Sequence, residues 1–303
     1  MSNNKEEIDY KGLCIDVGAN SGDFCLEFAK RNPLIIVIAI EPIPRLANQI
    51  VERASKLNLG NLLVHQLAID TSQGTCKLNL SLSGDYGTSS LLEFNDENLK
   101  NNEYWSKRDD LRHSETLDVN RTRLDILLEQ YPDLPIKYIK IDAQGFDLKV
   151  MESLGNKINS VEAGSLEAYT SESSNLYLDV DCSVGSVCNN LQKNNLSVVA
   201  IKPNDPACNE VNVFFAKNAS EYKKLEIDLN LKGIPNYDDK NFWHCPSSEF
   251  FGEIANQAIY TLKRIQELSS SRDSLVQELN NTRSKLNEIQ NSLVGKIFTY
   301  FKK

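Results

Sequence analysis

The stretch that decides the fold is "GLCIDVGANSGDF", from Gly12 to Phe24. The apolar run "LCIDV" is followed by a glycine turn and then by a helix-like stretch that begins at Asp23. This order of strand, glycine turn and helix is the usual opening of a nucleotide-binding α/β fold. Asp16 stands near the end of the expected strand, directly before the turn. Any ligand bound at this turn therefore has to tolerate a carboxylate.

The glycine pattern of this loop argues against a dinucleotide. The fingerprint G-x-G-x-x-G would place its glycines at Gly18, Asn20 and Asp23, and two of the three are missing. Asp23 would also lie in the first helical turn, where it would repel a pyrophosphate. Oxidoreductases and epimerases of the NAD-dependent kind are disfavoured further, because the sequence contains no Tyr-x-x-x-Lys pair.

A positively charged cofactor without phosphate suits the loop better. S-adenosylmethionine carries an ammonium and a sulfonium, together with a ribose and an adenine. We expect Asp16 to face the cation and Gly18 to let the backbone approach the cofactor. The residues predicted to bind it in this loop are Asp16, Gly18, Ala19, Asn20 and Gly22.

Two further acids extend the predicted cofactor site. Glu41 follows the apolar run at 34–40, and it comes 23 residues after Gly18. An acid at that strand end accepts hydrogen bonds from ribose hydroxyls, although a loop carboxylate near a helix start is the alternative. Asp70 follows the apolar run at 62–69, where such folds often contact adenine; a turn-forming Asp before "TSQGT" is equally consistent.

The rest of the chain to about residue 220 alternates strand-like and helix-like runs, which predicts an α/β domain with a mainly parallel sheet covered on both faces. The expected strands are 13–17, 34–40, 62–69, 136–142, 161–169, 196–202 and 210–218, and the expected helices are 23–32, 45–57, 123–131, 146–155 and 184–195. An irregular insertion at about 74–120 reads as a lid, a binding loop or disorder. Tyr86, Tyr104 and Trp105 either help it to close over a ligand or cover the flank of the domain.

Residues 221–252 read as a polar linker, and residues 253–303 as a helical tail. Apolar residues recur in the tail at alternating spacings of three and four, at Ile265, Leu268, Leu275, Leu279, Leu286, Ile289 and Leu293. This heptad pattern favours a coiled coil that binds a second copy or a partner protein, and a helix folded back on its own domain is the alternative. The final "GKIFTYFKK" could make weak contact with a membrane surface.

Composition restricts the partners and the compartment. The net charge of -9 argues against nonspecific binding to nucleic acid. We expect no secretory signal and no membrane span, because the start is polar and acidic and the apolar runs have strand length. Seven cysteines at irregular spacings then read as free thiols in a reducing compartment, so we expect a cytoplasmic protein.

Five motifs together resemble the FkbM-type S-adenosylmethionine-dependent methyltransferases. They are "DVGANSG" (16–22), "IEPIP" (40–44), "SSLL" (89–92), "RLDILL" (123–128) and "IKIDAQGFDLKVMESL" (139–154), and the similarity covers about 12–217. The resemblance implies a class I methyltransferase (Rossmann-like) sheet with an antiparallel last strand. It also implies methylation of a hydroxyl, often on a sugar or polyketide, and cofactor roles for Asp16, Gly18, Asn20 and Glu41. Gln144 stands where relatives often carry Glu.

An alcohol acceptor needs a base within hydrogen-bond reach. Asp142, at the end of an expected strand, is the best candidate, and capping of the next helix is its alternative. His113 in the insertion could be brought over the acceptor, with a solvent-exposed loop histidine as the alternative, and Glu167 could orient a hydroxyl. Asp142, Asp147 and Glu167 do not have a diagnostic metal-binding spacing, so no metal is predicted. The competing hypothesis is a scaffold that has kept the fold and lost part of its catalysis.

Overall fold

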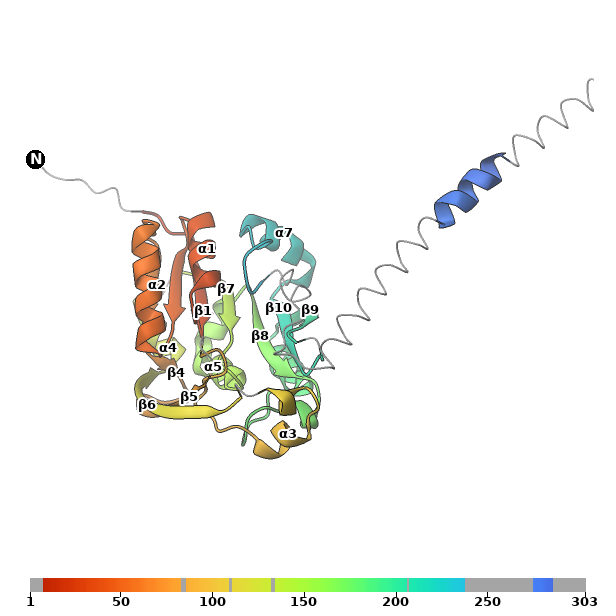
Figure 1. The fold of residues 1–303 in the computed structure, drawn as a ribbon. Helices are drawn as coiled ribbons and strands as arrows, with labels where there is room; N and C mark the ends of the chain where they lie inside the picture. The colour runs from red at the N-terminus through yellow and green to blue at the C-terminus, as the bar shows by residue number, and fades with distance from the viewer. Residues whose placement is uncertain are drawn as a thin grey trace, which may run out of the picture. The chain divides into compact units, whose positions relative to one another are not determined.

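The computed structural model describes residues 8–82, 86–108, 111–131, 134–205, 207–237 and 275–285. The chain forms two units, Met1–Gly252 and Glu253–Lys303. The first unit contains all strands of the described residues, and it carries the site discussed below (Figure 1).

A seven-stranded sheet forms the centre of the first unit, with strand order β3-β2-β1-β7-β8-β10-β9. Its strands are β1 (Leu13–Val17), β2 (Ile36–Ile40), β3 (Leu62–His65), β7 (Ile136–Ile141), β8 (Ala163–Tyr169), β9 (Ser197–Pro203) and β10 (Glu210–Ala216). β10 runs antiparallel to both of its neighbours, whereas the other pairs are parallel. The predicted mostly parallel sheet with an antiparallel last strand is confirmed. The strand order reverses between β1 and β7, which creates a crevice at their carboxyl ends.

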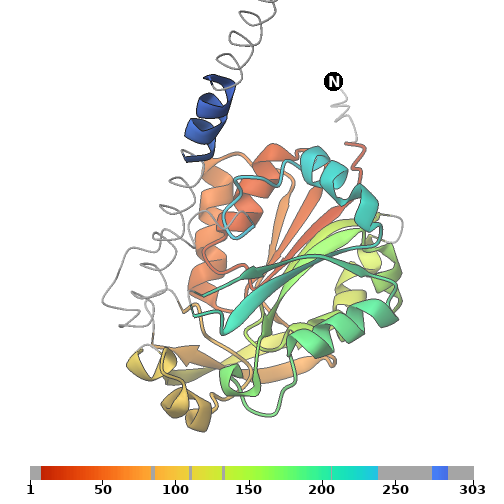
Figure 2. The same ribbon diagram turned by 90° about the vertical axis from the view of Figure 1, so that its right-hand side faces the viewer.

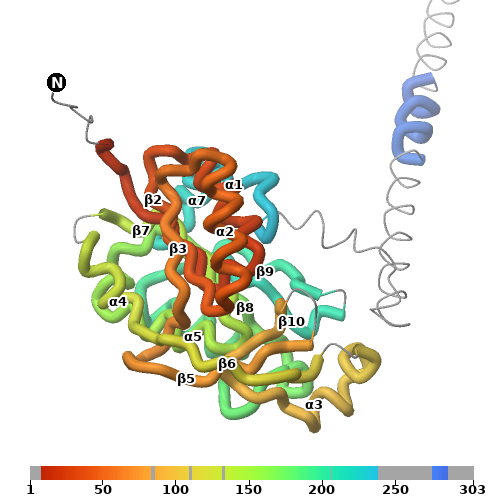
Figure 3. The backbone as a smooth tube through the Cα atoms, turned by 60° about the vertical axis from the view of Figure 1, so that its left-hand side comes forward, coloured from red at the N-terminus to blue at the C-terminus, as the bar shows by residue number. Residues whose placement is uncertain are grey.

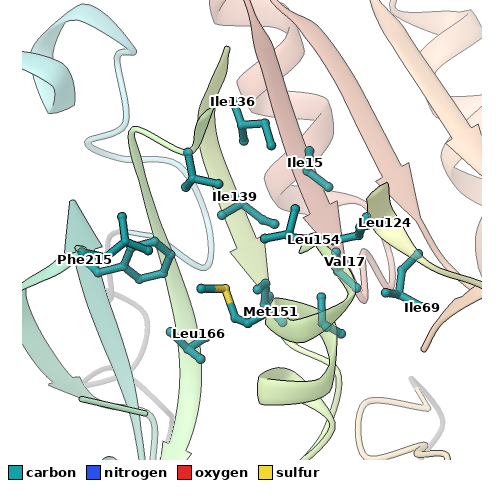
Figure 4. Packing of buried hydrophobic residues seen from close by; sticks show 14 of the residues in the cluster. Ile15, Val17, Ile69, Leu124, Ile136, Ile139, Met151, Leu154, Leu166 and Phe215 are labelled. Atoms are coloured by element: carbon teal, nitrogen blue, oxygen red, sulfur yellow. The ribbon is translucent and has the colours of Figure 1, made fainter. Parts of the chain in front are cut away.

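Helices cover both faces of this sheet (Figure 2). One face packs against α1 (Asp23–Arg31), α2 (Pro44–Lys56) and α7 (Tyr222–Asp228), and the other against α4 (Leu124–Leu127), α5 (Asp147–Ser153) and α6 (Val184–Lys193). Successive side chains of a strand point to opposite faces, so Ile15 and Cys14 enter different apolar clusters. Figure 4 shows Ile15, Ile139 and Met151 in one of them. Two buried faces explain why these strands read as nearly continuous apolar runs.

The insertion is more regular than predicted. It forms β5 (Gly74–Ser81) and β6 (His113–Thr122), which pair antiparallel, and β6 also pairs with β4 (Ala68–Ile69). The alternation of Cys76, Leu78 and Leu80 was the strand signal, hidden among polar residues. This second sheet lies across the carboxyl ends of the main strands (Figures 1 and 3). It packs on the start of α2 through Leu78 and Leu80.

Between β5 and β6 lie α3 (Asp96–Asn101) and a short 3-10 turn at Trp105–Lys107. Tyr104 and Trp105 are both 2% exposed. Asn102 Oδ1 accepts hydrogen bonds from their backbone N–H groups, and its Nδ2 donates to Asn209 Oδ1 at 2.8 Å. These two aromatic residues therefore cover the flank of the domain and do not close over a ligand, which is one of the two predicted alternatives.

The predicted linker at 221–252 is wrong for its first half. After α7 the chain buries Leu229, Leu231, Ile234 and Tyr237 against the face that carries α1. Lys202 on β9 lies over the ring of Tyr237, with Nζ 5.1 Å from the centroid. Polar residues between these apolar ones concealed the packing in the sequence. The folded domain thus extends to at least residue 237, rather than ending at 220.

In the second unit, residues 275–285 form a helix on which Leu275, Val276 and Leu279 are exposed. The other heptad positions and the final "GKIFTYFKK" lie outside the described residues, so the coiled coil stays a prediction. Across the described ranges, no helix combines the length and the hydropathy needed to cross a membrane.

Candidate active site

A cleft opens where β1, β2 and β7 end. Its polar lining includes Asn20, Glu41, Asp142 and Gln144, together with the backbone of Gly18. Apolar side chains from α2 and β5 complete the lining, and Tyr86 from the insertion reaches it as well. The cleft therefore lies at the point where the strand order reverses, which is the usual ligand position of open α/β sheets.

The glycines of the first loop are required by packing against protein. Gly18 and Gly22 have φ angles of 73° and 84°, in the left-handed region that favours glycine. A Cβ on Gly18 would lie 1.9 Å from the carbonyl oxygen of Asp142, and one on Gly22 would lie 2.8 Å from Ile50 Cγ1. We expected Gly18 to admit a close approach of the cofactor. Gly18 does line the cleft, but the close approach that demands glycine is made by the end of β7.

The side chain of Asp16 does not face the cleft as we expected. Asp16 is completely buried, and its Oδ1 lies 3.4 Å from Nζ of Lys140. The two residues are paired in register on β1 and β7, so they share one face of the sheet. Burial raises the pKa of Asp16, and the Lys140 charge acts against that effect. Asp16 therefore helps to join β1 to β7 beneath the loop and is not among the residues that line the cleft; its contact with the cofactor stays a prediction.

Lys140 is a buried charged residue of the site that was not among the predicted site residues. It is 6% exposed and lies within 3.4 Å of both Asp16 and Asp142. Burial alone would lower the pKa of Lys140, but the two carboxylates more than offset it and the net direction is upward. Lys140 thus stays cationic below the cleft. A lysine between isoleucines in a strand buried on both faces was the available signal, because buried lysines are almost always paired.

Glu41 lies where a ribose-binding acid is expected. It follows β2 directly and is 4% exposed. Its Oε2 accepts a hydrogen bond from the backbone N–H of Asn20 at 2.8 Å, and its Oε1 accepts one from Ile43 at 2.9 Å. Burial raises the pKa of Glu41 to about 7, although both backbone hydrogen bonds act to lower it. The carboxylate is thus fixed in orientation and is about half ionised at pH 7.

Asp70 is not among the residues that line the cleft. It follows β4 in the second sheet, where its carboxylate pairs with Arg121 of β6 and accepts a hydrogen bond from the Thr71 backbone. The turn-forming alternative is the one the structure supports, and the adenine contact stays a prediction. The single strand predicted at 62–69 is wrong, because β4 belongs to the second sheet and β3 to the main sheet.

Asp142 and Gln144 form the polar edge of the cleft at the end of β7. The Asp142 side chain is 39% exposed, and its Oδ2 lies 3.4 Å from Lys140 Nζ. Gln144 Nε2 donates to Asp142 Oδ1 at 2.7 Å, and it also lies 3.4 Å from Glu167 Oε2. Asp142 is therefore an oriented carboxylate that remains open to a ligand.

Glu167 and Asp147 are buried deeper. Glu167 is 6% exposed on β8, where Asn204 Nδ2 donates to its Oε1. Burial raises the pKa of Glu167 well above its usual value, and the neighbouring acids Glu210, Asp142 and Asp147 raise it further. A raised pKa favours the protonated form of a carboxyl, which can donate a hydrogen bond to a hydroxyl. The orienting role of Glu167 stays a prediction.

His113 packs against an aromatic residue of the insertion. Its ring stacks on Phe94 with 4.1 Å between centroids, and Phe94 stacks in turn on Tyr177 at 5.4 Å. Burial lowers the pKa of His113. The imidazole is thus packed within the insertion and is not among the residues that line the cleft, so the structure does not support delivery of His113 over the acceptor.

Asp147 gives a stability prediction. It is fully buried, and burial raises its pKa to about 7. The folded state thus holds a proton that the unfolded chain releases near pH 4, so this group makes stability fall between about pH 4 and pH 7 and adds no further change above that range. Asp147→Asn, which keeps an acceptor for the Glu167 N–H, is expected to raise Tm at pH 8 by about 2 °C or more, with little gain at pH 5.

Thermal unfolding at pH 5 and pH 8 measures this difference. The exposed Asp228→Asn is the matched control, for which no such pH-dependent gain is expected. An equal effect of Asp147→Asn at both pH values would contradict the assignment of a buried proton to Asp147.

The residues of the cleft fit S-adenosylmethionine. Glu41 offers carboxylate oxygens to ribose hydroxyls, and Ile43 and Leu46 offer an apolar surface to adenine. Among the described residues that line the cleft there are two acids, Glu41 and Asp142, and no lysine or arginine. These two acidic side chains suit a positively charged ligand and disfavour a pyrophosphate.

Comparison with known proteins agrees with this chemistry. Residues 16–181 match the model of the methyltransferase FkbM domain. No curated protein matches the chain. Similar solved structures include a precorrin-6y C5,15-methyltransferase from Geobacter metallireducens (12% identity, 69% of this chain and 81% of that chain, TM-score 0.35) and a SAM-dependent methyltransferase from Aquifex aeolicus (14%, 70% and 85%, 0.33). An rRNA methylase from Streptococcus thermophilus is similar at 12% identity, over 69% of this chain and 89% of that chain, with a TM-score of 0.36. The family match, which spans more than half of the chain, carries the assignment; these structural similarities do not.

Proposed function

Since the chain belongs to the FkbM methyltransferase domain family and is an S-adenosylmethionine-dependent methyltransferase, we propose that it methylates a hydroxyl of a sugar, a glycan or a related metabolite. The observation that carries the proposal is Asp142, a partly exposed carboxylate at the edge of the cofactor cleft. When bound, S-adenosylmethionine supplies an electrophilic methyl group on its sulfonium. Asp142 would take the proton of the acceptor hydroxyl as the hydroxyl oxygen gains the methyl group, and the methyl–sulfur bond would break to leave S-adenosylhomocysteine.

A second cavity supports an uncharged polar acceptor. It adjoins the turn after β7 and is lined by Gly145, Glu167, Asn175, Tyr177 and Glu210, among others. Burial, with the Asp205 charge second, raises the pKa of Glu210 to about 8. Carboxyl, amide and phenol groups can donate to and accept from several hydroxyls, whereas the acids disfavour a phosphorylated acceptor. The cavity has a volume of about 20 Å³, which admits a single hydroxyl rather than a sugar ring, so its lining bears on the polarity of the acceptor and not on its size.

The competing function is a scaffold that binds without catalysing. It is motivated by Gln144, because an amide cannot act as the base that a carboxylate could be at this position. Asp142 and the fitting cofactor cleft weigh against it. Both functions predict an intact fold, so binding of the cofactor and turnover have to be measured separately.

The test combines calorimetry with a transfer assay. We expect S-adenosylmethionine to bind with micromolar affinity, and we expect transfer of an isotope-labelled methyl group to at least one member of a panel of neutral sugars and glycans. Binding without transfer to any hydroxyl acceptor, but with transfer to an amine or a thiol, would contradict the proposal. Binding with no transfer at all would favour the scaffold.

We also propose that residues 253–303 mediate self-association, with a partner protein as the alternative. Leu275 and Leu279, two of the heptad positions, are exposed on the described helix and available for such a contact. Truncation after Phe251 is expected to reduce the mass measured by light scattering to that of a monomer and to leave cofactor binding intact. The same oligomeric mass with and without the tail would refute self-association through it.

The site of action that we propose is the cytoplasm. The six cysteines within the described residues are all free thiols, and Cys14 and Cys25 are fully buried. Buried unpaired cysteines are ordinary in a reducing compartment.

A further inference from the structure

The turn between β7 and α5 is held in an unusual conformation. Gln144 has a φ of 51° and is followed by Gly145 at 85°, so two successive residues are left-handed. A non-glycine residue in this region is uncommon and persists where neighbours hold it. Ser90 Oγ donates to the Gln144 carbonyl oxygen at 2.7 Å, and the Tyr177 ring packs so closely on Gly145 that a Cβ there would lie 2.6 Å from Cδ2. The insertion, through Ser90, and residues 170–179, through Tyr177, thus hold this turn from two sides.

The amide of Gln144 connects the two cavities. Its Nε2 donates to Asp142, which lines the cofactor cleft, and lies 3.4 Å from Glu167, which lines the second cavity. Its Oε1 accepts a hydrogen bond from the Tyr177 hydroxyl at 2.9 Å. The orientation of the amide follows from Asp142, because a flipped group would point its oxygen at that carboxylate.

We propose that Gln144 is a positioning residue that orients the Asp142 carboxylate toward the acceptor and links it to Glu167 and Tyr177. The proposal rests on the proposed function, since it assumes that Asp142 acts on an acceptor hydroxyl. Gln144 itself transfers no proton. It supplies a neutral donor at a point where a carboxylate would crowd two acids that are already present.

The charge surrounding this cluster explains why a neutral group is needed. The charged or titratable groups around it lie on β1, β7, α5, β8, β10, the insertion and residues 170–179. They are Asp16, Arg108, Lys140, Asp142, Asp147, Glu167, Tyr177 and Glu210. Of the two cations, Lys140 pairs with Asp142, whereas Arg108 acts on Glu210. Another carboxylate at 144 would have to share a proton with Asp142, because like charges at hydrogen-bond distance do not both ionise freely.

Gln144→Glu tests this directly. The carboxyl carbon of Asp142, assigned by its disappearance in Asp142→Asn, is followed by ¹³C NMR during a pH titration of the full-length protein. The titration midpoint is expected about one pH unit or more higher in Gln144→Glu than in the wild type. The exposed Gln130→Glu is the matched control and is expected to leave the midpoint unchanged. An unchanged midpoint in Gln144→Glu overturns the proposal.

Kinetics provides the second readout. Gln144→Ala is expected to lower kcat by about 10–100-fold with little change in KM for the cofactor, because a misplaced base costs turnover and leaves binding alone. In Gln144→Glu the acid limb of the kcat–pH profile is expected to move to higher pH. If Gln144→Glu instead lowered kcat by the same factor at every pH and left the acid limb of the profile in place, Gln144 would have only a structural role. If no hydroxyl acceptor is turned over by the wild type, the proposed function fails, and the NMR titration still decides the contact between Gln144 and Asp142.

Discussion

Asp142→Asn is expected to lower kcat for methyl transfer by about 10²–10⁴-fold, which is the usual contribution of a general base. Asn keeps the size of the side chain but cannot accept a proton from the acceptor hydroxyl. Because Asp142 is partly exposed and its ion pair with Lys140 spans 3.4 Å, the fold is expected to survive the change. Initial rates at saturating cofactor measure the effect.

The control separates catalysis from cofactor binding. The affinity of Asp142→Asn for S-adenosylmethionine, measured by calorimetry, is expected to stay within about threefold of the wild type. The exposed Asp118→Asn on β6 controls for a general loss of negative charge. A large loss of affinity combined with an unchanged kcat would make Asp142 a cofactor ligand, and it would remove the base from the proposed function.

Glu41 is expected to govern cofactor affinity. Glu41→Gln should raise the Kd for S-adenosylmethionine by about 10–100-fold, because a hydrogen bond to a charged group contributes about 1.5–3 kcal/mol and about 1.4 kcal/mol corresponds to tenfold in Kd. The amide would also turn an N–H toward the backbone donor of Asn20 or Ile43, both of which now donate to the carboxylate. Calorimetry measures Kd, and thermal unfolding checks that the variant folds.

The same carboxylate predicts a pH dependence. Burial raises the pKa of Glu41 to about 7, so the ionised form that accepts from ribose hydroxyls predominates above that pH. The Kd is therefore expected to rise as pH falls below 7, approaching about tenfold per pH unit, and to become flat in Glu41→Gln. A Kd that is independent of pH in the wild type would contradict ribose binding by an ionised Glu41.

The main sheet could be predicted because its strands are buried on both faces. Runs such as 34–40 and 136–142 are then apolar at nearly every position, and chain order alone places Glu41 at a strand end. The family motifs lie on the same strands and loops, so resemblance and pattern pointed to one cleft. Asn20, Glu41 and Asp142 were all identified in this way.

What could not be predicted depends on pairing between distant segments. The contact of Asp16 with Lys140 follows from the register of β1 against β7, and the contact of Asp70 with Arg121 follows from the second sheet. Neither strand pairing can be derived from the sequence of the strand alone. The packing of 221–237 was missed for a related reason, because its apolar residues are separated by Asn, Lys and Gly and bury themselves only against α1 and the sheet.

The most direct test of the account is a crystal structure of the protein with S-adenosylhomocysteine. It is predicted to lie between the 18–20 loop and Glu41, with a ribose hydroxyl on the Glu41 carboxylate and its sulfur directed toward Asp142. Density for it in another cavity, or a dinucleotide that binds this cleft in its place, would contradict the account.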